Sequence, residues 1–138
     1  MNYQEELKLS TKGYCDLIKI TSKIKKVISN SGIKEGLVLV FVTGSTAGIT
    51  TIEFEPNLVK DFKEFIEKLI PADKDYHHNK TWGDGNGFSH IRASLIGPSL
   101  AVSLNQGSLE LGQWQEVVLC DFDNRSRERE IVIKVIGD

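Results

Sequence analysis

The sequence predicts an α+β fold built mainly from antiparallel strands, arranged as a sheet or a sandwich. Two observations support this: strand-like segments outnumber helical ones, and the two kinds alternate irregularly along the chain. Irregular alternation disfavours a doubly wound parallel sheet, which needs a helix between successive strands. With 138 residues, 40% of them hydrophobic, the chain has enough apolar side chains for one domain, residues 1–138, around its own core.

Eight segments have the pattern of a strand. Residues 3–9 alternate apolar and polar side chains, which is the period of a strand with one buried face. Residues 36–42 are almost wholly apolar and rich in β-branched side chains, which predicts a central strand covered on both faces. The other predicted strands are residues 15–20, 49–54, 100–104, 109–111, 114–122 and 131–136, with turns at 105–107 and 123–124.

Two or three helices are expected. Thr21 or Ser22 can cap a helix that ends at Gly32. Asn57 is the predicted cap of the clearest helix, which Pro71 ends. Its apolar stripe, expected in the core, consists of Leu58, Phe62, Phe65, Ile66, Leu69 and Ile70. A short helix over residues 88–96, ended by Gly97 and Pro98, is the third.

The composition narrows the function classes. A formal net charge of -2 argues against a nucleic-acid partner. No apolar run approaches the roughly 20 residues of a membrane-spanning helix, and the first residues lack a basic, then apolar, leader. We therefore expect a soluble, cytoplasmic protein without a membrane partner. Cys15 and Cys120 lie in apolar segments without metal-type spacing and are expected to be buried thiols.

All three histidines fall in one polar, glycine-rich segment, residues 77–92. Neutral imidazole binds zinc and other divalent metals well, and the glycines make the loop flexible enough to bring His78 and His90 together. The spacing matches no compact metal motif, and a metal site would need a third ligand. The carboxylates available for that role are Asp84, Glu53 and Glu55. A surface loop with exposed histidines is the alternative interpretation.

If the short helix forms, His90 shares a polar face with Asn86 and Ser94, while Ile91 and Leu95 point into the core. The helix would then hold His90 rigidly, as a metal ligand or a general base must be held.

Three further features could bind an anion. The linker 43–48 offers backbone amides and the hydroxyls of Ser45 and Thr46, but it has no Walker lysine and can equally be a plain strand connection. Arg92 points elsewhere on its helix and is either a solvated charge or a phosphate contact. Alternate arginines near the C-terminus would share one strand face, to bind phosphate or to protect an exposed edge strand. They are Arg125, Arg127 and Arg129.

Four strings of residues carry a resemblance to a known family. They are Tyr76-His77-His78-Asn79, Trp82 to Gly87, Ser89 to Gly97 and Leu111 to Glu116. Together they resemble the YjbQ-like family, also called uncharacterised protein family 0047, over nearly the whole chain. The resemblance implies a β-sandwich that assembles as a homotrimer, with sites near the subunit boundaries. It also implies a weak thiamine-phosphate synthase activity.

The family motifs select His78 over His77 and place a Ser-His pair on Ser89 and His90. Many members carry a further histidine after the central strand, in a His-Thr-(Ser/Thr)-Ala string, where this chain has Gly44. A possible third imidazole is therefore missing, and a bound metal would have to use water or a carboxylate.

The leading hypothesis for function is thiamine-phosphate synthesis, which joins hydroxymethylpyrimidine diphosphate to thiazole phosphate and releases diphosphate. A divalent metal, zinc or magnesium, would lie between His78 and His90. The partner would be a small phosphorylated molecule, whose phosphate oxygens would contact Ser45, Thr46, Asn86, Arg92 and Arg127. One alternative is a metal-assisted hydrolase, in which Asp84 or His90 moves the proton. The other is a non-catalytic trimer that binds a metal or a small anion.

Overall fold

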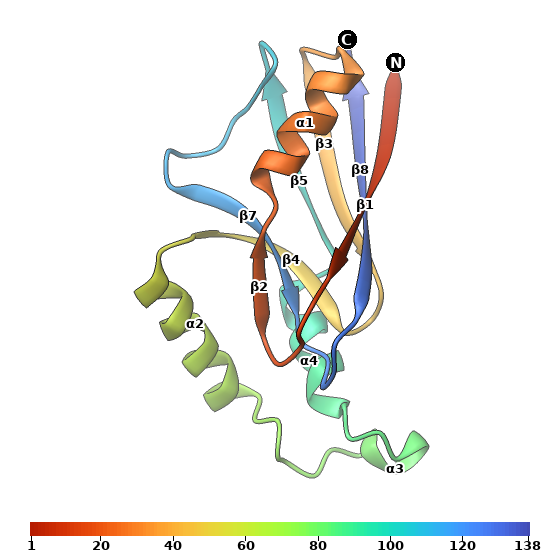
Figure 1. The fold of residues 1–138 in the computed structure, drawn as a ribbon, viewed down its shortest axis with the longest axis vertical. Helices are drawn as coiled ribbons and strands as arrows, with labels where there is room; N and C mark the ends of the chain where they lie inside the picture. Colours follow the sequence, from red (N-terminus) through yellow and green to blue (C-terminus); the bar gives the residue numbers. More distant parts are fainter.

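The computed structural model describes residues 1–138, which form two antiparallel sheets and four helices (Figure 1). The strands are β1 (Asn2–Ser10), β2 (Asp16–Lys19), β3 (Gly36–Thr43), β4 (Ala47–Glu53), β5 (Ser99–Asn105), β6 (Ser108–Leu109), β7 (Gln115–Asp121) and β8 (Glu128–Gly137). The helices are α1 (Thr21–Ser31), α2 (Pro56–Leu69), α3 (Asn79–Trp82) and α4 (Gly87–Ile96). The larger sheet has the order β1-β8-β3-β5-β6 and the smaller one β2-β7-β4. The predicted α+β class and its antiparallel strands are confirmed.

The main core lies between the two sheets and α1. Alternate residues of β3 and β8 point into it, including Val38, Val40, Ile131 and Ile133, all fully buried. β1 pairs with β8 along its whole length and keeps the predicted alternation of buried and exposed positions. The prediction for the central strand is wrong in one respect, because β3 buries only one face. Its apolar composition had indicated cover on both faces.

Two helix caps differ from prediction. Thr21 does not cap α1, since its hydroxyl accepts a hydrogen bond from the Val117 amide of β7. The cap of α2 is Glu55, whose carboxylate accepts hydrogen bonds from the first amides of the helix, so Asn57 lies inside it. Gly32 ends α1 in the left-handed conformation, as predicted.

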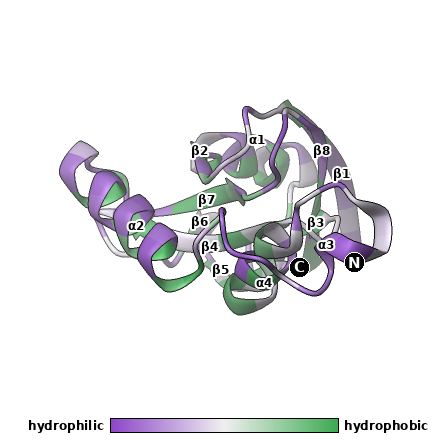
Figure 2. Ribbon diagram, turned by 90° about the horizontal axis from the view of Figure 1, so that it is seen from below, coloured by the Kyte–Doolittle hydropathy of each residue, from purple (hydrophilic) through white to green (hydrophobic).

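α2 stands away from the sheets, with hydrophobic residues along one side (Figure 2). Ile66 belongs to a second, smaller core cluster that includes residues of β7, and Ile70 is also buried. Phe65 and Leu69 remain more than half exposed, so the expectation that the whole stripe lies in the core is wrong. The helix turns only part of its apolar surface toward the sheets.

The α3 and α4 end of the molecule lies opposite the chain termini, which are close together (Figure 1). α4 packs against β4 of the smaller sheet. Gly48 of β4 has no side chain, so the Gly97 carbonyl at the end of α4 can approach its backbone closely. α3 is a single turn that the sequence pattern did not predict. No helix of the protein combines the length and the apolar character needed to cross a membrane.

Candidate functional site

His78 and His90 meet at the end of the molecule formed by α3 and α4. Their ring centroids are 4.5 Å apart and the rings are inclined at 62°. His78 occupies the N-cap position of α3, without a side-chain capping bond, and His90 lies within α4, so helices position both residues. Neither imidazole makes a hydrogen bond or an ion pair with another protein group, so their ring nitrogens are open to a ligand. The prediction that the loop brings these two histidines together is confirmed.

Close packing at the start of α4 produces this meeting. The Asn79 side chain accepts a hydrogen bond of 2.9 Å from the Gly87 amide, which ties α3 to α4. Gly87 packs so tightly on Tyr76 that a Cβ at this position would lie 2.6 Å from the tyrosine Cβ. Glycine is therefore required here to let the two histidine-bearing segments approach.

The pair opens onto a cavity of about 310 Å³. Its wall includes Tyr76, whose hydroxyl donates to the Pro71 carbonyl at 2.7 Å and whose pKa is raised, chiefly by burial. The Lys74 ammonium lies 5.4 Å from the Tyr76 ring and supplies a positive charge at the rim. Asp75 and His77 also line the cavity, which thus combines three histidines, a cation, a carboxylate residue and an aromatic wall.

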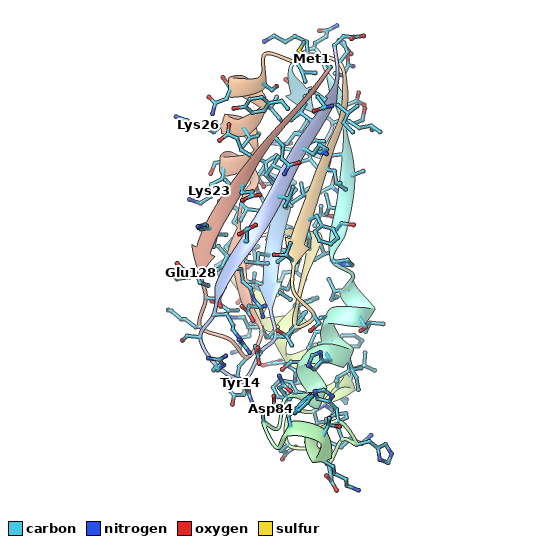
Figure 3. The ribbon with its side chains drawn as sticks, turned by 90° about the vertical axis from the view of Figure 1, so that its right-hand side faces the viewer. Met1, Tyr14, Lys23, Lys26, Asp84 and Glu128 are labelled. Atoms are coloured by element: carbon cyan, nitrogen blue, oxygen red, sulfur yellow. The ribbon has the colours of Figure 1, made fainter.

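Asp75 lines the same cavity, but no carboxylate completes a metal site with the two histidines. The protein contains no group of three or more His, Cys, Asp or Glu side chains placed to hold a metal ion. Asp84 is exposed in the same end of the molecule (Figure 3), between two left-handed glycines, and its carbonyl accepts a hydrogen bond from Asn124. Glu53 and Glu55 line a separate cavity with Trp114. A third protein ligand from these three carboxylates is therefore ruled out, and proton transfer by Asp84 stays a prediction.

α4 has a different buried face from the one expected. Ile91 and Leu95 are exposed, so the expectation that they point into the core is wrong. Phe88, Ser89 and Arg92 face inward instead. The polar face is as predicted in part: Ser94 is exposed and its hydroxyl donates to the His90 carbonyl at 2.8 Å.

Arg92 is neither a solvated charge nor a free phosphate ligand. It is only 2% exposed, and its Nε and Nη2 donate to the Ile70 carbonyl at the end of α2. Nη2 also pairs with Glu67, and the guanidinium lies 4.8 Å from the Phe88 ring. Arg92 therefore ties α2 to α4, and both interpretations from the sequence are corrected.

The arginine row at the C-terminus is divided by the fold. Arg125 is exposed and precedes β8, whereas Arg127 and Arg129 pair with buried aspartates. The Arg127 Nε lies 2.6 Å from Asp123, and the rest of its guanidinium is partly exposed. β8 lies between β1 and β3, so the interpretation of this segment as an edge strand is wrong.

A buried polar cluster lies beneath the Gly44 loop. Asp121 and Asp123 are fully buried, and Arg129 is 7% exposed. Arg129 binds both carboxylate oxygens of Asp121, at 2.7 and 3.0 Å, and donates to the Thr46 hydroxyl at 2.6 Å. Thr46 in turn donates to Asp123 at 3.1 Å. The Thr46 hydroxyl is thereby fully engaged, which argues against the predicted role of its side chain in binding an anion.

Asp123 links the cluster to the first turn of α4. The side-chain Nδ2 of the buried Asn86 is 3.5 Å from an Asp123 carboxylate oxygen, and the side-chain Oδ1 of Asn86 has no hydrogen-bond partner. Burial by itself would raise the pKa of Asp123, but the Asn124 amide and the Arg127 guanidinium outweigh it and hold the pKa below its usual value. Of the predicted anion ligands, Ser45 and Arg127 keep exposed donors, whereas Asn86 does not.

A family model described as UPF0047 protein YjbQ-like matches residues 5–138. The chain belongs to this family. A UPF0047 protein of Methanothermobacter thermautotrophicus is 38% identical over 135 residues, which cover 98% of this chain and 92% of the relative.

Solved structures extend the YjbQ-like match to the fold. A YbjQ-like protein of unknown function from Sulfolobus solfataricus P2 superposes with a TM-score of 0.95 at 30% identity, covering 100% of this chain and 99% of that one. An uncharacterized conserved protein of the same family from Clostridium acetobutylicum has a TM-score of 0.88 at 35% identity, covering 96% and 99%. The family and fold predicted from the motifs are confirmed, and the family is one of uncharacterised function.

The buried aspartates of this YjbQ-like chain were missed by sequence reasoning. Asp121 and Asp123 stand two residues apart directly after a buried apolar strand, and Arg127 and Arg129 have the same spacing. The two aspartates and the two arginines have the same i, i+2 spacing and lie on segments joined by a turn. Side chains with this spacing share one face of an extended segment, so the opposite charges could have been predicted to pair. The arginine spacing alone instead suggests a phosphate-binding row or a charged edge strand.

Proposed function

We propose that the protein holds a divalent metal ion between His78 and His90 and uses this site to form thiamine phosphate. The observation that carries the proposal is the convergence of the two imidazoles, 4.5 Å apart, with ring nitrogens that no protein group occupies. We place the activity in the cytoplasm, where the free thiols of Cys15 and Cys120 would stay reduced.

The donors present suit zinc better than magnesium. Imidazole is a good ligand for zinc, whereas magnesium prefers carboxylate and phosphate oxygens. Two imidazoles provide half of a tetrahedral shell, and the remaining positions are left for water or for oxygens of a phosphorylated substrate. The pair therefore fits an open site, in which substrate oxygens would complete the coordination.

In the proposed reaction the C–O bond of hydroxymethylpyrimidine diphosphate breaks and a C–N bond to the thiazole forms. A divalent ion on His78 and His90 would supply a Lewis acid for the departing diphosphate. The Lys74 ammonium at the rim adds positive charge on the same side, and Tyr76 provides a flat wall for an aromatic ring. The cavity of about 310 Å³ orients the reactants and limits access of water.

The test compares thiamine phosphate formation by the wild type, His78→Ala/His90→Ala and His77→Ala. His77 is the matched control, because it is an exposed imidazole that lines the same cavity but is not part of the pair. We expect the double variant to lose turnover to background and His77→Ala to keep it. Equal rates in the double variant and the wild type, or no product in either, would refute the proposed activity.

Metal content provides a second readout that does not depend on turnover. Protein purified without chelator and dialysed against zinc should retain one ion per chain, and the double histidine variant should retain none. Retention of zinc without product formation would favour the second candidate function, a binding protein without turnover. The absence of a third protein ligand that would complete a metal site with the two imidazoles is the observation that favours this second candidate.

We also propose that the protein assembles as a homotrimer through the outer face of the larger sheet. Leu37, Leu39 and Phe41 of β3 are exposed there, next to Ile136 of β8, which pairs with Leu37. Such a row of large apolar side chains marks an association surface. Light scattering should give a trimer for the wild type and a smaller species for Leu39→Glu, and a monomeric wild type would contradict the proposal.

A further inference from the structure

Arg129 has two N–H donors that no protein acceptor uses. An arginine side chain carries five such donors. The one on Nε and the two on Nη2 are engaged by Asp121 and by the Thr46 hydroxyl. Nη1 makes no hydrogen bond. The residue is only 7% exposed, so its charge is largely buried while one guanidinium nitrogen, Nη1, has no protein partner.

Gly44 is the residue that lies against this free nitrogen. A Cβ added to Gly44 would stand 2.8 Å from the Arg129 Nη1. Gly44 also lines a cavity of about 170 Å³. The cavity is bounded by Gly44, Ser45, Ala47, Ala93, Ser94 and Pro98. Arg129 is not itself a wall residue of this cavity, but the absence of a side chain at position 44 leaves its Nη1 uncovered beside Gly44, which is one.

The chemistry of the cavity suits a small anion. Its walls contain the hydroxyls of Ser45 and Ser94 and no carboxylate. The two aspartates behind it are balanced by Arg127 and Arg129, so they do not repel an incoming anion. At about 30 Å³ for each water molecule, the cavity of about 170 Å³ corresponds to about six waters, which is enough space for the five heavy atoms of a phosphate group.

We propose that this cavity is a phosphate subsite, in which the Arg129 Nη1 and the Ser45 hydroxyl hold a phosphate or phosphate monoester. Asp121 fixes the guanidinium from behind by two hydrogen bonds, so Nη1 is oriented before the anion arrives. Ser94, one turn of α4 beyond His90, also lines the cavity. The role of this cavity in the synthase reaction rests on the function proposed above. The binding of inorganic phosphate to the cavity does not depend on that function.

The test is an NMR titration with inorganic phosphate in the presence of a chelator, at constant ionic strength set with sodium chloride. We expect the amide signals of Gly44 and Ser45 to shift, with a dissociation constant in the millimolar range. Gly44→Ala places a methyl group against Nη1 and should weaken binding about tenfold or more, the loss expected for a hydrogen bond to a charged group.

Gly32→Ala is the matched control, because Gly32 also has a positive φ, of 70°, but faces open space at the end of α1. It should bind phosphate like the wild type. Ser94→Leu is a second variant, which fills the cavity from an exposed helix position and should also weaken binding at least tenfold. It keeps the test decisive if Gly44→Ala does not fold.

Two results would overturn the subsite: no phosphate-dependent shifts in the wild type, or unchanged affinity in the folded cavity variants. The variant His78→Ala/His90→Ala separates this inference from the proposed reaction. It should bind phosphate normally while making no thiamine phosphate. If the wild type binds phosphate at this cavity but forms no product, the reaction is refuted and the subsite stands.

Discussion

The buried Asp121 carboxylate should be the most sensitive single polar group of the fold, and Asp121→Asn tests this. One of its oxygens accepts from the Thr11 hydroxyl at 2.5 Å and from the Arg129 Nε at 2.7 Å. The other accepts from the Arg129 Nη2 and from the Asp123 amide, both at 3.0 Å. Asparagine keeps the shape of the side chain but replaces one acceptor oxygen by a donor NH₂ group.

The expected loss follows from this count. Whichever way the amide is oriented, at least two donors lose their acceptor, and at least one of them belongs to the Arg129 guanidinium. A hydrogen bond to a charged group contributes about 1.5 to 3 kcal/mol, and removal of one partner of a buried ion pair costs about 3 to 5 kcal/mol. We therefore expect the free energy of unfolding to fall by about 3 to 5 kcal/mol, a large part of the total for a domain of this size.

Urea denaturation followed by circular dichroism measures this loss, with the midpoint moving at an unchanged slope. Glu67→Gln is the control, because it removes the charge that pairs with Arg92 while Glu67 is 54% exposed. That change should cost at most about 1 kcal/mol. If Asp121→Asn lowers the free energy of unfolding by less than about 1 kcal/mol, the argument that burial makes the Asp121 ion pair important for stability is refuted.

Three further outcomes are expected. The pKa of Asp123 is lower in the folded protein than the value of about 4 expected for the unfolded chain. The ionised carboxylate therefore stabilises the fold at pH values above about 4, and this stabilisation is lost as the pH falls through the pKa of the folded state. The free energy of unfolding of Asp123→Asn should accordingly depend less on pH in this acid range, and an unchanged dependence would contradict the assignment. Burial raises the pKa of the Cys15 thiol to about 11 and also raises that of Cys120, so Ellman's reagent should label neither cysteine at pH 8 until urea unfolds the protein. Fast labelling of the folded state would show that the thiols are accessible. Gly13→Ala should lose about 1 to 3 kcal/mol more than Gly32→Ala in urea denaturation, since both glycines have a positive φ but a Cβ at Gly13 would lie 2.6 Å from a backbone carbonyl oxygen. Equal losses would contradict this packing argument.

The part of the candidate site that could be predicted is the part held by local motifs. His78 and His90 were selected by the residues around them, and the short helix that carries His90 has helical spacing and a glycine stop that are visible in the sequence. The two histidines approach each other because Gly87 has no side chain and so leaves room for Tyr76, which is only eleven residues away in the sequence. Local interactions of this kind are encoded over a few residues, so pattern and resemblance recover them.

The environment of the arginines could not be predicted in the same way. The sequence predicts Arg92 to be a solvated charge or a phosphate contact and Arg129 to belong to a phosphate-binding row or an edge strand, yet the fold buries both. Their partners are Glu67 and Ile70 on another helix for Arg92, and an aspartate eight residues away across a turn for Arg129. Composition gives no information on such partners, because they become neighbours only when the sheets close.

The sequence by itself determined the α+β class, the antiparallel strands, the family and the pair of histidines, because periodicity and short motifs act through neighbouring residues. Only the tertiary structure decided which charges are buried, which face of β3 and α4 meets solvent, and that a glycine in the loop after β3 uncovers a buried guanidinium. These features depend on long-range packing, in which the burial of one side chain is set by residues far away in the chain.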